Sequence, residues 1–121
     1  MRSFGIKDYN ELSDFLQTRY IHDGFFQYAA YDQITKEFTV HIENDVWNDS
    51  LDMVFVDVCD FISVSDYKWS DDETINCLVL LNDSKAWPEY IDSRNHKDKL
   101  CFVWEMISGN QIIISCAKLR I

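Results

Sequence analysis

The chain has 121 residues, of which 47% are hydrophobic, with only three glycines and one proline. This length fills one core, and the composition excludes disordered, collagen-like and linker-rich chains, so a single domain over residues 1-121 is predicted. The formal net charge of -10 predicts repulsion from phosphate and anionic lipid, which argues against nucleic acid and membranes as partners. A basic protein, a cation or simple solubility would fit that charge.

The first predicted element is an amphipathic helix over residues 8–20. Its apolar side chains recur at helical spacing, at Tyr9, Leu12, Phe15 and Leu16. Asp8, with Glu11 three residues on, predicts a capping box at the start. The helix is expected to end before His22, where Gly24 supplies a turn.

Two strands, 25–32 and 37–44, are predicted to form a hairpin, the second with Phe38, Val40 and Ile42 inward and Thr39, His41 and Glu43 outward. A longer run, 51–64, is apolar on both faces, as in a central strand. Strands are also predicted at 74–82, 100–107 and 111–121, with a Ser108-Gly109-Asn110 turn in the last hairpin. Residues 84–95 are predicted to be a helical turn or irregular loop.

These elements predict an α+β fold, with the N-terminal helix packed on a curved, mainly antiparallel sheet of about six strands. One helix covers only part of such a sheet. Either the sheet curls onto itself, or one apolar face is left for a partner, which includes a second copy of the chain.

Four cysteines, Cys59, Cys77, Cys101 and Cys116, lie far apart in predicted strands, and we expect them to be reduced and buried. No short-range pairing of these with His22, His41 or His96 has the spacing typical of zinc sites. The opening residues lack the pattern of a secretion signal, and no apolar run approaches the roughly 20 residues that cross a bilayer. A cytoplasmic protein is expected.

Carboxylates crowd the middle of the chain, where only Lys68 opposes ten of them. They are Glu43, Asp45, Asp49, Asp52, Asp57, Asp60, Asp66, Asp71, Asp72 and Glu73. The central glycine of a calcium loop is missing there, so neither a metal nor a cofactor is predicted.

Aromatic residues interleave with these acids and suggest a surface that binds a protein, because aromatic side chains anchor partners while charges steer them. The predicted partner-binding residues are Trp47, Asp49, Asp66, Tyr67, Trp69, Asp71 and Asp72. The alternative is that the rings pack over sheet edges and the acids are merely solvated.

Catalytic patterns are missing from the sequence. There is no Gly-x-Ser-x-Gly elbow and no glycine-rich phosphate loop. The His22-Asp23 doublet is interpreted as a turn before Gly24, and apolar neighbours are expected to leave the Cys59 and Cys77 thiols inert. We therefore assign no catalytic residue and expect a protein that is not an enzyme.

The segments YIHDGFFQYAAYDQITKEFTVHIE, LDMVFVDVCDF and QIIISCAKLRI, with a Trp-containing turn between the first two, resemble small bacterial proteins of the toxin-immunity type. The resemblance spans most of residues 20–121 and implies a bacterial origin, without catalytic residues to carry over. Its functional implication is an inhibitor or immunity protein that neutralises a basic toxin. The alternative is a self-associating, homodimeric structural or accessory domain.

Overall fold

A computed structural model describes residues 2–17, 21, 23–45, 48–64, 74–81 and 98–121. Its elements are β1 (Ser3–Phe4), the 3-10 helix η1 (Ile6–Asp8), α1 (Tyr9–Leu16), β2 (Phe25–Asp32), β3 (Glu37–Asn44), β4 (Asp49–Val56), β5 (Asp60–Val64), β6 (Ile75–Leu80), β7 (Leu100–Met106), β8 (Gln111–Cys116) and β9 (Lys118–Arg120). Within these ranges no helix is long and apolar enough to cross a bilayer. The segment 84–95 lies outside the described residues.

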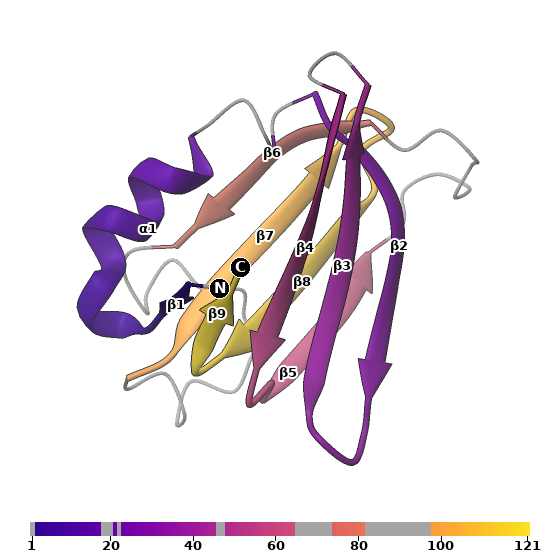
Figure 1. Ribbon diagram of the computed structural model, residues 1–121. Helices are drawn as coiled ribbons and strands as arrows, with labels where there is room; N and C mark the ends of the chain where they lie inside the picture. Colours follow the sequence, from indigo (N-terminus) through magenta and orange to yellow (C-terminus); the bar gives the residue numbers. More distant parts are fainter. Residues whose placement is uncertain (1, 18–20, 22, 46–47, 65–73, 82–97) are drawn as a thin grey trace.

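The strands form two antiparallel sheets, so the prediction of a sheet-rich α+β fold is confirmed and the single six-stranded sheet is wrong. The five-stranded sheet has the order β1-β9-β4-β3-β2, and the four-stranded sheet has the order β5-β8-β7-β6. Figure 1 shows β2, β3 and β4 lying across the four-stranded sheet. The arrangement is a two-layer sandwich.

The described residues form nine strands where six were predicted, because two predicted strands are each broken into two and the short β1 was not predicted. The 51–64 run breaks after β4, where Asp57 takes a left-handed φ of 54°. The 111–121 run breaks at Ala117, whose N–H donates to the Val56 carbonyl at 3.0 Å. Both breaks lie side by side, and β4–β5 and β8–β9 thereby pass from one sheet into the other.

The sheets also meet through β2 and β6. Phe25 forms an isolated antiparallel bridge with Thr74, and the Ile75 N–H donates to the Gly24 carbonyl at 2.8 Å. The Asp23 N–H returns a bond to the Ile75 carbonyl at 3.2 Å. The hairpin that carries β2 and β3 is therefore attached to the other sheet at the start of β2.

The core lies between the two sheets, with α1 beside it. Trp104, Phe102 and Phe55 are fully buried at its centre. Leu12 and Leu16 direct the apolar side of α1 into the same cluster, and Figure 1 shows the helix alongside β6. The amphipathic pattern of the N-terminal segment is thus satisfied by packing against a sheet edge.

Asp8 immediately precedes α1, but the capping interaction differs from the prediction. Its carboxylate accepts the Gly5 N–H at 2.9 Å and caps no N–H of α1. The reason is the preceding 3-10 turn η1, which places the Asp8 side chain back toward Gly5. The predicted helix is also longer than α1, which ends at Leu16.

The predicted Ser108-Gly109-Asn110 turn joins β7 to β8, and Gly109 has a φ of 93° that L side chains rarely adopt. We expect Gly109→Ala to lower the free energy of unfolding by about 1 kcal/mol, because alanine is strained at positive φ. Among the described residues, no heavy atom other than those of Gly109 and its two chain neighbours lies within 4 Å of the added methyl, so the loss reports the backbone strain alone. Gly5→Ala is the control: the space is equally open and φ is -111°. Urea unfolding of both variants should show a loss for the first alone.

Candidate functional site

Six of the seven predicted partner-binding residues lie outside the described residues: Trp47, Asp66, Tyr67, Trp69, Asp71 and Asp72. The seventh, Asp49, is exposed and opens β4, where its carboxylate accepts the Ser50 N–H at 2.8 Å. The predicted surface is therefore located in the structure at one point only, at the start of β4.

That point belongs to a segment of unusual charge, residues 23–57, which we call the acidic β2–β4 unit. It comprises β2, β3, β4 and their connections. Its sequence has eight carboxylates, at Asp23, Asp32, Glu37, Glu43, Asp45, Asp49, Asp52 and Asp57. Lys36 is the only lysine or arginine in the segment, which gives a formal charge of -7 with His41 neutral. Most of the net charge of the chain thus falls on one three-stranded unit.

The two faces of the unit differ sharply. Along β3 buried and half-buried residues alternate, so the predicted inward positions Phe38, Val40 and Ile42 are confirmed. Thr39, His41 and Glu43 lie on the opposite, outer face, as predicted. The core therefore fixes which side chains this sheet presents to its surroundings.

A row of side chains crosses the outer face at the level of His41. Tyr28 pairs with His41 across β2 and β3, and His41 pairs with Asp52 across β3 and β4. The Tyr28 and His41 rings stack with centroids 5.2 Å apart and planes 10° apart. The Tyr28 side of this row is open, since that residue is 52% exposed.

The His41 imidazole is held between two carboxylates. Its Nδ1 donates to Asp52 Oδ1 at 2.5 Å, and its Nε2 donates to Glu43 Oε1 at 2.6 Å. A neutral imidazole has one N–H, so only the imidazolium forms both bonds. The hydrogen bonds to Asp52 and Glu43 raise the pKa of His41, against a smaller opposing effect of desolvation. The row therefore ends in a charge-assisted cluster in which both acids are hydrogen-bonded to one imidazolium, with a net charge of one negative unit.

A second ion pair lies on the same sheet, where Arg120 Nη2 donates to Glu37 Oε2 at 3.0 Å. This arginine reaches the unit from β9. Asp32 uses its carboxylate locally, accepting the Ile34 and Thr35 N–H groups at 2.8 and 3.2 Å. The unit thus combines carboxylates that are held by hydrogen bonds or an ion pair with exposed acids such as Asp49, which starts β4.

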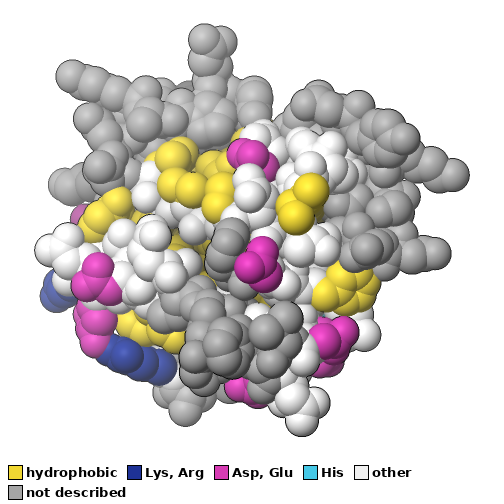
Figure 2. All heavy atoms as spheres, turned by 90° about the horizontal axis from the view of Figure 1, so that it is seen from above, with side chains coloured by type: hydrophobic (Ala, Val, Ile, Leu, Met, Phe, Trp, Pro, Cys, Tyr) yellow, Lys and Arg dark blue, Asp and Glu magenta, His cyan; other side chains and the backbone are white. Residues whose placement is uncertain are grey.

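The charge distribution is also visible at the end of the molecule where β3 ends and β4 begins. Asp and Glu side chains are spread over the described part of this end, and the visible Lys and Arg side chains gather at one side (Figure 2). Among the described charged side chains of this end, acidic ones are therefore more widely spread than basic ones.

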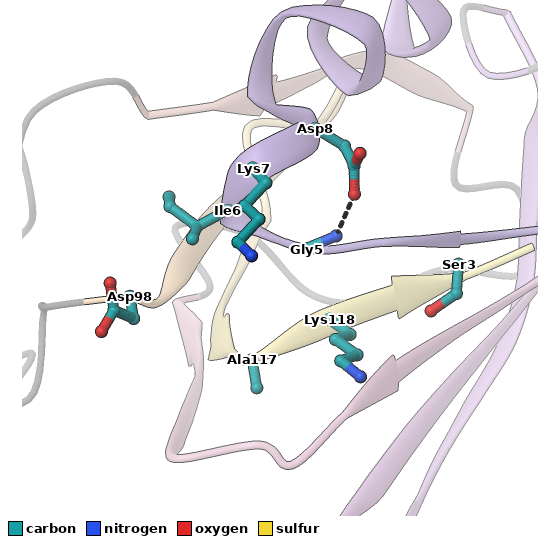
Figure 3. Close-up of a pocket in the computed structure, with 8 residues that line it drawn as sticks. All are labelled: Ser3, Gly5, Ile6, Lys7, Asp8, Asp98, Ala117 and Lys118. Carbon is teal, nitrogen blue, oxygen red and sulfur yellow. Dashed lines mark hydrogen bonds between the residues drawn. The ribbon is translucent and has the colours of Figure 1, made fainter.

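A hollow of about 500 Å³ lies elsewhere, near the N-terminus and β9. It is lined by Ser3, Gly5, Ile6, Lys7, Asp8, Asp98, Ala117 and Lys118. Figure 3 shows that its charged groups lie apart around the hollow and that Asp8 turns back to Gly5. Two lysines and two aspartates that do not converge give this hollow neither a marked charge nor an evident catalytic arrangement.

The thiols are placed unevenly. Cys101 and Cys116 are buried as predicted. Cys77 is only half-buried and Cys59 is exposed, which corrects the expectation for both of these residues. Cys59 lies two residues after the bend at Asp57, where the chain turns between the sheets. Burial raises the pKa of Cys77, and it raises the pKa of Cys101 to about 12. Such thiols are weak nucleophiles at neutral pH.

Metal-ligating side chains do not converge in the part of the chain that the structure describes, since no group of three or more His, Cys, Asp or Glu residues is suitably placed there. In the His41 cluster, the two carboxylates lie on different ring nitrogens. Each ring nitrogen is therefore already hydrogen-bonded to a carboxylate oxygen of the protein.

No protein-family model, curated protein or solved structure matches this chain. The resemblance to proteins of the toxin-immunity type therefore stays a prediction. Functional inference depends on the charge, exposure and contacts of the acidic β2–β4 unit.

Proposed function

We propose that this protein is a non-enzymatic protein-binding module that presents its acidic β2–β4 unit to a basic partner. The observation that carries the proposal is the concentration of eight carboxylates against one lysine in residues 23–57. These residues form three strands of a sheet whose other face is fixed by the core.

Besides charge, a binding surface needs an anchoring side chain, and the row on the outer face contains one. Tyr28 is an exposed aromatic ring, and His41 holds it from behind by stacking. Aromatic side chains of low conformational freedom are frequent anchors in interfaces, while surrounding charges increase the association rate of an oppositely charged partner. Tyr28 is therefore proposed as an anchor within an acidic rim.

An inhibitor or immunity protein directed against a basic toxin is the form of this function that we favour. Enzymes that cleave nucleic acid need basic surfaces to contact phosphates. An acidic module competes for such a surface, and the sequence resemblance to toxin-immunity proteins agrees with this assignment. Inhibition of this kind requires occlusion and no catalysis by the module.

The proposal is tested by affinity capture from the lysate of the source organism at low and moderate salt, with mass spectrometry of the bound proteins. We expect a basic protein that is retained at low salt and released as salt screens the charges. Asp49→Lys should retain about tenfold less of it at low salt. Asp14→Lys, an exposed site on α1 with the same change of charge, is the control and should retain the wild-type amount.

Equal losses for both variants would reduce the effect to net charge and contradict a role for the acidic β2–β4 unit. A self-associating domain is the second candidate, favoured by the uncharged strand stretch Phe25–Tyr31 at the edge of the sheet. Light scattering separates the two candidates, because the monomer has a mass of 14.4 kDa. A stable dimer without a basic partner would favour the second.

A further inference from the structure

Strand β2 forms one edge of the five-stranded sheet. It pairs with β3 on one side from Phe25 to Asp32, apart from the bulge at Gln27. On its other side, among the described residues, the one bridge is Phe25 to Thr74 at its start. Beyond that bridge Gln27, Tyr28, Ala29 and Ala30 are all exposed. An edge strand of this kind presents backbone N–H and C=O groups that a further strand could pair with.

The sequence of β2 is unusual for an exposed edge. Natural edge strands are commonly protected by lysine, proline, inward charges or bulges. Phe25–Tyr31 has neither a charged residue nor a proline, and its one irregularity is a bulge between Phe26 and Tyr28. Beyond the bulge stand Ala29 and Ala30, whose methyl side chains are the smallest in the strand and leave the backbone there accessible.

Aromatic rings lie on both sides of this edge. On the inner side Phe61 of β5 is 44% exposed and contacts Tyr31 at 4.7 Å and Phe38 at 5.2 Å between ring centroids. On the outer side stands Tyr28, stacked on His41. Phe61 lies beside Tyr31, three residues from Tyr28 along β2. Because side chains alternate along a strand, an added strand would set one side chain against Phe61 and the side chain three residues away, on the opposite face, against Tyr28.

We propose that the partner binds by adding an extended, basic segment as a strand along the edge of β2 that, among the described residues, has no strand partner beyond Phe25. This inference rests on the proposed function and specifies how that function is carried out. Backbone hydrogen bonds would supply affinity, and the two aromatic positions would select the side chains. The formal charge of residues 23–57, -7 with His41 neutral and -6 with His41 as the imidazolium, favours a basic segment. The same charge opposes a second copy of the chain, because pairing would bring two acidic β2–β4 units together.

The test uses the full chain and a peptide of eight residues in which lysine and valine alternate. A second peptide has the same side chains and charge but is N-methylated at every backbone nitrogen, so that it has no main-chain donors. We expect the first peptide to bind at least tenfold more tightly at low salt, since only it can pair as a strand. Amide exchange measured by NMR should slow in β2 between Gln27 and Tyr31.

Two variants test the contribution of Phe61, on the inner side of the β2 edge. Phe61→Ala should weaken binding of the first peptide severalfold, whereas Val79→Ala should not. Val79 is a suitable control because it is 42% exposed and lies on β6, the edge of the other sheet. Circular dichroism of both variants confirms that each is folded before binding is compared.

The outcomes distinguish this inference from the function on which it rests. Equal binding of both peptides would overturn strand addition and leave a charge-driven interaction intact. Failure of both peptides to bind at low salt would overturn both proposals. Light scattering could instead find a dimer in the absence of peptide, with amide exchange in β2 slower than in the monomer at lower protein concentration. A second copy would then occupy the edge, which also overturns the inference.

Discussion

Replacing Phe55 with alanine is expected to lower the free energy of unfolding by about 3–5 kcal/mol, the usual cost of removing a buried aromatic ring. Phe55 is fully buried on β4. Its ring lies 5.0 Å from that of Phe102 and 6.3 Å from that of Trp104, both on β7 in the opposite sheet. It also contacts Phe38 of its own sheet at 6.4 Å. Removing it would leave a cavity between the two layers.

Urea denaturation followed by tryptophan fluorescence measures this loss. Ile34→Ala is the control, because Ile34 is 93% exposed in the β2–β3 turn and such sites usually change stability by less than about 0.5 kcal/mol. A loss near that of the control would contradict the conclusion that this ring cluster joins the sheets. The total free energy of unfolding of a domain of this size is roughly 5–15 kcal/mol, so Phe55→Ala should remove a large fraction of it.

The sequence predicted local elements better than their assembly. The alternation in Phe38, Val40 and Ile42 is a property of a few neighbouring residues, and the burial of β3 follows it. The bend at Asp57 has no comparable signal, because neither glycine nor proline marks it and aspartate there adopts a left-handed φ. A run that is apolar on both faces therefore suggested one central strand, where the chain instead leaves one sheet and enters the other.

The candidate site shows the same division. The sequence positions of the acids put several of them in or near β4, and the alternation of side chains along β3 puts His41 and Glu43 on the outer face. Which residues meet there depends on register, because a shift of one residue moves a strand's side chains to the other face. Tyr28 and Asp52 join His41 only through the pairing of three strands. The aromatic loops that the sequence favoured lie outside the described residues, so their role stays a prediction.

Replacing His41 with glutamine is expected to cost about 1–2 kcal/mol at pH 6, because two charge-assisted hydrogen bonds are lost. The expected loss is modest because the side chains of Asp52 and Glu43 are 61% and 37% exposed, and exposure to solvent weakens ion pairs. The His41 side chain itself is 16% exposed, so solvent does not fully replace its partners.

The loss should depend on pH in one direction. The pKa of folded His41 is raised above the ordinary value of 6.5, so the folded state holds this proton more tightly than the unfolded state does. The stabilisation is therefore complete below pH 6.5 and disappears as the pH rises through the raised pKa. Wild type and His41→Gln should differ most in acid and converge in alkali when unfolding is measured across this range.

NMR titration identifies the group, since the His41→Gln spectrum lacks one imidazole resonance. Asp52→Asn should lower the pKa of His41, because its carboxylate makes the largest contribution to the increase. Tyr28→Ala removes the stacked ring but leaves both carboxylates, so the raised pKa should persist. A His41 resonance that titrates at or below pH 6.5 in the wild type would contradict the imidazolium assignment. The Tyr28 anchor would then rest on a neutral ring that donates to one carboxylate only.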